Sequence, residues 1–84
     1  MHYEVLILRR AQKHLADLPS REYDRLKTAI LALSDNPRPH GSLKLTGRSG
    51  WRLRSGDYRV LYEINDLSRT VTILDVGNRR DVYS

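Results

Sequence analysis

Three arginines in one short stretch, Arg52, Arg54 and Arg59, have the type and spacing to bind a phosphate group. The dipeptide Gly56-Asp57 lies between two strand-like runs and predicts a two-residue hairpin turn of the II′ type, which prefers glycine first. Because side chains alternate along a strand, this turn places Arg54 opposite Arg59, with Arg52 on the same face. Like charges that face each other destabilise a sheet. A fold that accepts this cost is expected to use the charge, and a polyanion is the obvious ligand.

The whole chain is basic. It has 84 residues, with 15 Lys+Arg against 10 Asp+Glu, a formal net charge of +5 and a pI near 10.0. A pI above about 9 in a small domain is typical of nucleic-acid-binding proteins. On charge alone, an acidic protein partner is the alternative.

Composition also limits the cofactors and the compartment. The chain has no cysteine, which excludes disulfides and thiolate metal sites and fits a reducing cytoplasm. His2, His14 and His40 lack the spacing of metal ligands, so neither a metal nor another cofactor is expected. The apolar run 5–8 is too short for a signal-peptide core or a membrane span. We therefore expect one cytoplasmic domain, residues 1–84, with no membrane partner.

Hydrophobic periodicity predicts an α+β fold of order β-α-α-β-β-β. A strand over 3–8 precedes a helix over 9–18, and a second helix after Pro19 carries an apolar stripe that includes Leu26, Ile30 and Leu33. An alternating segment at 43–45 follows the turn-rich residues 35–41, and strands are expected at 51–54, 58–64 and 70–76. Helices followed by strands favour an antiparallel sheet with both helices on one face. The other face is then free for the arginines.

Three segments resemble the RelE/ParE superfamily of toxins from bacterial toxin–antitoxin pairs. They are Gly-Trp-Arg-Leu-Arg at 50–54, Gly-Asp-Tyr-Arg-Val-Leu-Tyr-Glu-Ile at 56–64 and Val-Gly-Asn-Arg-Arg-Asp-Val-Tyr at 76–83. The resemblance covers essentially the whole chain and includes the order of elements. RelE-like members cleave messenger RNA in the ribosomal A site without a metal, using basic residues and a C-terminal tyrosine. ParE-like members poison DNA gyrase and typically lack that set. The resemblance therefore implies the RelE-like branch, a toxin of a type II system that is neutralised by a cognate antitoxin.

The resemblance also implies site residues and partners. The catalytic positions fall on Arg52, Arg54, Arg59, Arg79 and Tyr83. Further basic residues expected to bind RNA are Lys44, Arg48 and Arg80. The expected partners are the antitoxin, the ribosome and its mRNA, and the toxin–antitoxin complex is expected to bind operator DNA through the antitoxin.

Metal-free RNA cleavage gives these residues roles. The ribose 2′-OH attacks the adjacent phosphate and leaves a 2′,3′-cyclic phosphate and a free 5′-OH, which requires a base, charge stabilisation and an acid. Arg59 and Arg79 suit the phosphate clamp because a guanidinium donates two hydrogen bonds at once. Arg54 can protonate or solvate the leaving oxygen. Arg52 can hold a neighbouring phosphate.

The general base is left open by the sequence. Arginine stays protonated in proteins, so it is a poor base. The resemblance also shows Asn78 at a position where many RelE-like toxins carry a histidine. Tyr83 is the first candidate, because surrounding arginines favour its ionised form. Lys44 and His40 are weaker candidates.

Two other functions are also compatible with the sequence. One is a ParE-like inhibitor of DNA gyrase. The other is a catalytically weakened toxin that acts as an antitoxin-binding or operator-regulating module, which Asn78 and the all-arginine strand would explain. In both cases Arg52 and Arg54 would form a solvated face that pairs with an acidic antitoxin, and Tyr83 would pin the tail to the sheet.

Overall fold

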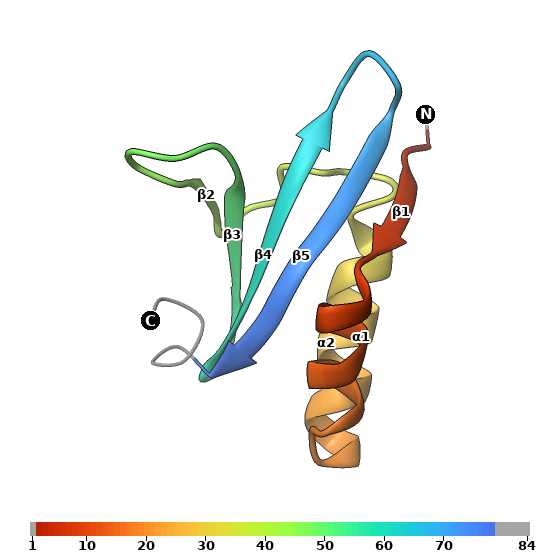
Figure 1. Ribbon diagram of the computed structural model, residues 1–84, viewed down its shortest axis with the longest axis vertical. Coiled ribbons are helices and arrows are strands. Elements are labelled where there is room, and N and C mark those ends of the chain that lie inside the picture. The colour runs from red at the N-terminus through yellow and green to blue at the C-terminus, as the bar shows by residue number, and fades with distance from the viewer. Residues whose placement is uncertain (1, 79–84) are drawn as a thin grey trace.

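Five strands and two helices make up residues 2–78, the part of the chain that the computed structural model describes (Figure 1). The helices are α1 (Arg9–Ala16) and α2 (Ser20–Ala32). The strands are β1 (Glu4–Ile7), β2 (Ser42–Lys44), β3 (Trp51–Ser55), β4 (Tyr58–Asn65) and β5 (Thr70–Asn78). The α+β class is confirmed. Three predicted site residues, Arg79, Arg80 and Tyr83, lie outside the described residues.

The strands form one sheet in the order β1-β5-β4-β3-β2. Neighbours from β2 to β5 pair antiparallel. Four strands were predicted, and β2 is an additional one: it overlaps the segment 43–45, in which the sequence showed only an alternating pattern. However, β1 pairs with β5 in parallel, with Val5 beside Val71, so the sheet is mixed and not wholly antiparallel. A parallel pair requires a long crossover connection, which the two helices supply. Local patterns in the sequence do not reveal the direction of such a distant pair.

Both helices cover one face of the sheet, and the core lies between the two layers (Figure 1). Leu26, Ile30 and Leu33 are fully buried, as the apolar stripe predicted. Across from them, the sheet contributes fully buried side chains that include Val60 and Tyr62. Since these two alternate with Arg59 and Leu61 along β4, the arginine belongs to the face without helices.

The hairpin between β3 and β4 has the predicted register. Ser55 pairs with Tyr58 and Arg54 pairs with Arg59. Gly56 has a φ of +60°, whereas Asp57 does not adopt a positive φ, which is the pattern of a type II′ turn. The hairpin prediction is therefore confirmed residue by residue.

Polar contacts fasten the loop after α2 to the sheet. The Tyr62 hydroxyl donates a 2.8 Å hydrogen bond to the Pro37 carbonyl. The Arg38 guanidinium donates to both carboxylate oxygens of Asp66, at 3.3 and 2.8 Å, and the Tyr3 hydroxyl donates to the same carboxylate at 2.6 Å. None of the described helices is long and apolar enough to cross a membrane.

Candidate functional site

The helix-free face of the sheet carries the arginine row, which we define as Arg52, Arg54 and Arg59. Arg54 and Arg59 are direct register partners, and Arg52 pairs with Leu61 one step further along the same face. Arg59 is only 6% exposed, whereas Arg54 is exposed and Arg52 is half-buried. The structure thus brings together three of the five predicted catalytic residues. A charge held as rigidly as Arg59 is suited to bind an anion in one fixed position.

Lys44 and Arg48 lie away from the arginine row. Lys44 pairs with Trp51 in the register of β2 and β3, and its ammonium lies 6.0 Å from the centroid of the Trp51 ring. The Arg38 guanidinium also lies over this ring, 5.3 Å from its centroid. Arg48 is exposed in the loop before β3. These cations mark the β2 edge of the molecule, so their predicted contact with RNA would be separate from the phosphate clamp.

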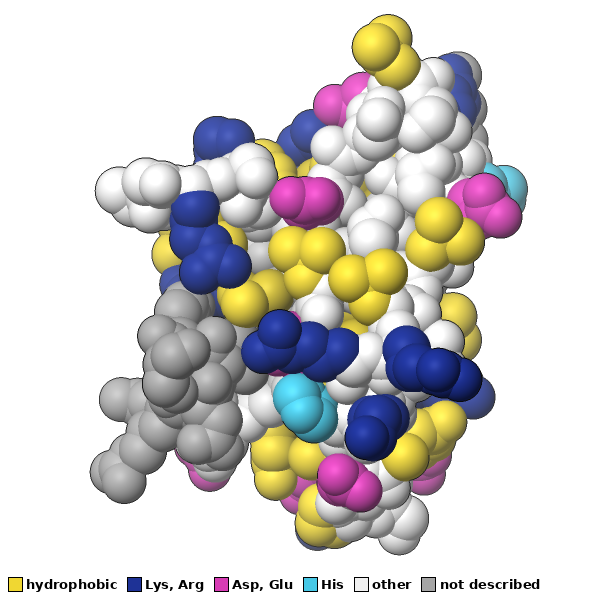
Figure 2. Space-filling model, viewed as in Figure 1, with side chains coloured by type: hydrophobic (Ala, Val, Ile, Leu, Met, Phe, Trp, Pro, Cys, Tyr) yellow, Lys and Arg dark blue, Asp and Glu magenta, His cyan; other side chains and the backbone are white. Residues whose placement is uncertain are grey.

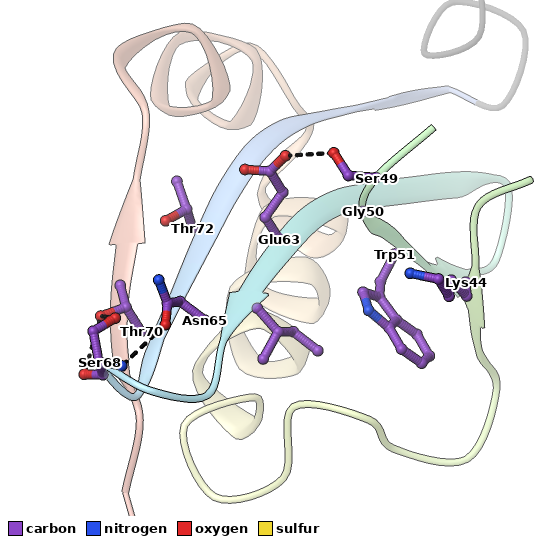
Figure 3. A pocket seen from close by; sticks show the side chains of 10 residues that line it. Lys44, Ser49, Gly50, Trp51, Glu63, Asn65, Ser68, Thr70 and Thr72 are labelled. Carbon is purple, nitrogen blue, oxygen red and sulfur yellow. Dashed lines mark hydrogen bonds between the residues drawn. The ribbon is translucent and has the colours of Figure 1, made fainter. Parts of the chain in front are cut away.

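A cavity of about 360 Å³ lies at the far end of β4 from the hairpin (Figure 3). Its lining is mostly polar: Lys44, Ser49, Gly50, Trp51, Glu63, Ile64, Asn65, Ser68, Thr70 and Thr72. The Ser49 hydroxyl donates to Glu63 Oε2 at 3.1 Å, and Asn65 Oδ1 accepts the backbone N–H of Ser68 at 3.0 Å. These polar groups satisfy one another. The carboxylate of Glu63 also makes the cavity a poor site for a phosphate.

A second group of charged side chains joins α1 to β5. His14 Nδ1 lies 2.5 Å from Asp75 Oδ1, and Arg10 Nε lies 3.1 Å from Asp75 Oδ2. The Asp75 side chain is 12% exposed, which makes it the most buried acid among the ion pairs of the described residues. Sequence reasoning missed this group. The sequence did contain one indication: Asp75 lies within the β-branched run 70–76. Burial of an unpaired carboxylate in such a strand costs free energy, so a partner for Asp75 could have been expected.

A cavity of about 320 Å³ adjoins this second group. It is lined by Arg10, His14, Asp17, Leu18, Tyr58, Asp75, Val76, Gly77 and Asn78. Gly77 is also the register partner of Arg59, so the cavity lies one strand away from the arginine row. In Figure 2, lysine and arginine side chains gather over the lower right of this face, where the helices lie, and others lie at its upper left.

Metal ligation is not indicated by the side chains that the structure describes. Within residues 2–78, no group of three His, Cys, Asp or Glu side chains is placed to hold a metal ion. His40, one of the weaker base candidates, is exposed in the loop before β2.

Comparison with known proteins identifies the family. Residues 5–83 match the family described as ParE toxin of type II toxin-antitoxin system, parDE. A Methanocaldococcus jannaschii protein named as a RelE1 toxin is 30% identical over 87 residues, which cover 99% of this chain and 97% of that protein.

Solved structures agree with that result. The toxin–antitoxin complex RelBE2 from Mycobacterium tuberculosis contains a chain that is 31% identical, with a TM-score of 0.84 and coverage of 96% of this chain and 95% of that one. The RelE–RelB complex from Pyrococcus horikoshii gives 32% identity and a TM-score of 0.81, with 96% and 99% covered. The isolated RelE toxin of E. coli gives 30% identity and a TM-score of 0.73, with 96% and 90% covered. The chain therefore belongs to the ParE toxin family of the RelE/ParE superfamily and is a toxin of the type II toxin–antitoxin class.

Proposed function

We propose that this toxin is a metal-independent endoribonuclease that cleaves mRNA in the ribosomal A site, in the cytoplasm. The observation that carries the proposal is the Arg54–Arg59 register pair on the helix-free face, with Arg52 beside it. Two guanidinium groups placed opposite each other repel, and an anion bound between them offsets that repulsion. A phosphodiester is such an anion, and RNA supplies its own nucleophile in the adjacent 2′-OH.

In the proposed reaction, Arg59 holds the non-bridging oxygens of the scissile phosphate as negative charge builds up on the phosphorane. Arg54, which is exposed, solvates or protonates the departing 5′-oxygen. Arg52 binds a neighbouring phosphate. On sequence grounds alone, Arg79 would add a second clamp, Tyr83 would contact the ribose or a base, and Arg80 would bind RNA.

The proposal includes an antitoxin partner. Several of the similar solved structures are RelE–RelB complexes. A cognate antitoxin segment that covers the arginine row would block access of mRNA and would neutralise the toxin. Binding of the complex to operator DNA would then take place through the antitoxin.

Substitution of Arg59 tests the proposal. Arg59→Lys keeps the charge but removes the two-pronged donor, and we expect cleavage to fall about 100- to 1,000-fold, the usual effect of losing one transition-state donor. The assay is primer extension on ribosomes programmed with a defined mRNA, with the 3′ ends checked for a cyclic phosphate. Because Arg59 is buried, Arg54→Ala serves as a second variant with less risk to folding. The matched control Arg21→Ala removes an exposed arginine of α2 and should leave the rate unchanged.

Gyrase inhibition is the second candidate, because the matching family is described as ParE toxin. A message that stays intact on active ribosomes would contradict the nuclease proposal. A block of DNA supercoiling by the purified chain that persists in Arg59→Lys would then favour the gyrase function.

A further inference from the structure

The His14–Asp75 pair has the geometry of an oriented base. A carboxylate only accepts hydrogen bonds, so His14 Nδ1, 2.5 Å from Asp75 Oδ1, must donate. The lone pair of the neutral imidazole is then on Nε2. The His14 side chain is 47% exposed and the Asp75 side chain only 12%, so the imidazole can be reached by a ligand while its partner is shielded.

Three groups hold the Asp75 carboxylate in place. Its Oδ1 accepts the backbone N–H of Val76 at 2.9 Å as well as His14, and its Oδ2 accepts Arg10 Nε at 3.1 Å. A carboxylate fixed in this way selects one tautomer of the imidazole and stabilises the imidazolium after proton uptake.

The pair borders the cavity that lies beside the arginine row. His14, Tyr58, Gly77 and Asn78 line this cavity of about 320 Å³, which is within the size range of small-ligand pockets. Gly77 pairs with Arg59 across neighbouring strands, which lie about 4.8 Å apart. Since glycine has no side chain, nothing from that position separates the cavity from Arg59. A ribose bound at this cavity would lie about one strand spacing from a phosphate held by Arg59.

We propose that His14 is the general base of RNA cleavage, with Asp75 as its positioning residue. The inference rests on the proposed function. As the 2′-oxygen bonds to phosphorus, its proton moves to His14 Nε2. The bond between phosphorus and the 5′-oxygen breaks, the 5′-oxygen leaves with the electron pair and takes a proton from solvent, and His14 later returns its proton to water. This assigns to an imidazole the task for which no arginine of the row is suited.

The pH dependence of the cleavage rate separates a base from a merely structural pair. A base must be unprotonated to accept the 2′-OH proton, so the single-turnover rate should rise with pH and then level off. Among the described residues, the charged or titratable groups around His14 are Arg10 on α1, Asp17 at the C-terminal cap of α1, Asp75 on β5 and Tyr58 on β4. We expect His14→Gln to slow cleavage about 100- to 10,000-fold and to abolish the rise. Asp75→Asn should slow it less, and free imidazole should partly restore His14→Ala.

His2→Gln is the matched control. His2 Nδ1 lies 2.9 Å from Asp35 Oδ1, but both side chains of that pair are largely exposed and it lies outside the cavity. The variant loses a histidine–aspartate pair and should keep the wild-type rate and pH profile.

The possible results are distinct. If His14→Gln keeps the wild-type rate and pH profile while Arg59→Lys still loses cleavage, the base assignment is wrong and the nuclease proposal stands. If His14→Gln loses rate equally at every pH, together with thermal stability and without imidazole rescue, the pair is structural and the assignment is also wrong. If the wild type cleaves no RNA, both proposals fail.

Discussion

Asp66 ties together three segments that are distant in the sequence. Its carboxylate accepts hydrogen bonds from Tyr3, which leads into β1, and from Arg38, in the loop before β2. The hydrogen bonds from Arg38 and then Tyr3 lower the pKa of Asp66 below its usual value. The hydrogen bond to the same carboxylate raises the pKa of Tyr3, which therefore keeps its proton at neutral pH.

Removal of the Asp66 charge is expected to make the stability of the native state less dependent on pH in the acid range. A carboxyl group whose pKa is lowered on folding stabilises the native state above its unfolded pKa, about 3.9, and this contribution is lost as the pH falls through the folded pKa. Asp66→Asn should therefore lower the melting temperature at pH 6–7, and this difference from the wild type should shrink below about pH 4 and vanish as the pH falls through the folded pKa of Asp66. Thermal unfolding followed by circular dichroism from pH 2.5 to 7 measures this. The control Asp24→Asn changes an exposed acid of α2, and an equal loss there would contradict the prediction.

Individual site residues were predictable where they are local in sequence. Arg54 and Arg59 are five positions apart, and the turn between them fixes their pairing. The contact between His14 and Asp75 spans 61 positions, so it depends on how α1 packs along β5, which no local pattern contains. The spacing of the histidines gave no indication that one of them is hydrogen-bonded to an acid.

For helices and strands, too, the features set by local sequence could be predicted, whereas those set by contacts between distant segments could not. The helices and the β3–β4 hairpin follow from periodicity and turn chemistry, and the structure confirms them. The parallel pairing of β1 with β5 and the irregular register at Leu61/Tyr62 do not follow, because both depend on contacts across the sheet. Direction and register of distant strands are decided by the whole core.

Tyr62 fastens the loop after α2 to the central strand β4. Its side chain is fully buried, burial raises its pKa, and its hydroxyl donates to the Pro37 carbonyl. Tyr62→Phe removes one hydrogen bond and leaves the buried Pro37 carbonyl without this donor. We therefore expect the free energy of unfolding to fall by about 1–3 kcal/mol. Urea denaturation checks this. Tyr23→Phe keeps the ring that lies 5.6 Å from Lys27 Nζ and should change stability by less than about 0.5 kcal/mol.

At the scale of the molecule, positive charge is divided between separate surfaces. The arginine row lies on the helix-free face, whereas Lys44 and Arg38 lie beside Trp51 at the β2 edge. With a net charge of +5, long-range attraction to RNA is expected from the whole molecule. Of these two surfaces, the arginine row is the one that is expected to contact the scissile phosphate.

The dependence of RNA affinity on salt concentration should report how many phosphate contacts the protein makes. For a non-cleavable oligonucleotide with 2′-O-methyl riboses, each phosphate contact contributes about 0.7 to the slope of log affinity against log salt concentration. The double substitution Arg52→Ala/Arg54→Ala should reduce that slope by about 1.4, and Arg21→Ala should leave it unchanged. Fluorescence anisotropy between 50 and 300 mM salt provides the measurement. Equal slopes for all three proteins would show that the arginine row does not bind phosphate.

The parallel pairing of β1 with β5 has a consequence for biosynthesis. Glu4–Ile7 are synthesised before both helices and well before their partners, Thr70–Ile73. Until β5 emerges, β1 lacks its neighbour and α1 lacks the strand along which it packs. The parallel pair, and with it the full sheet that carries the arginine row, can therefore form only once β5 has left the ribosome.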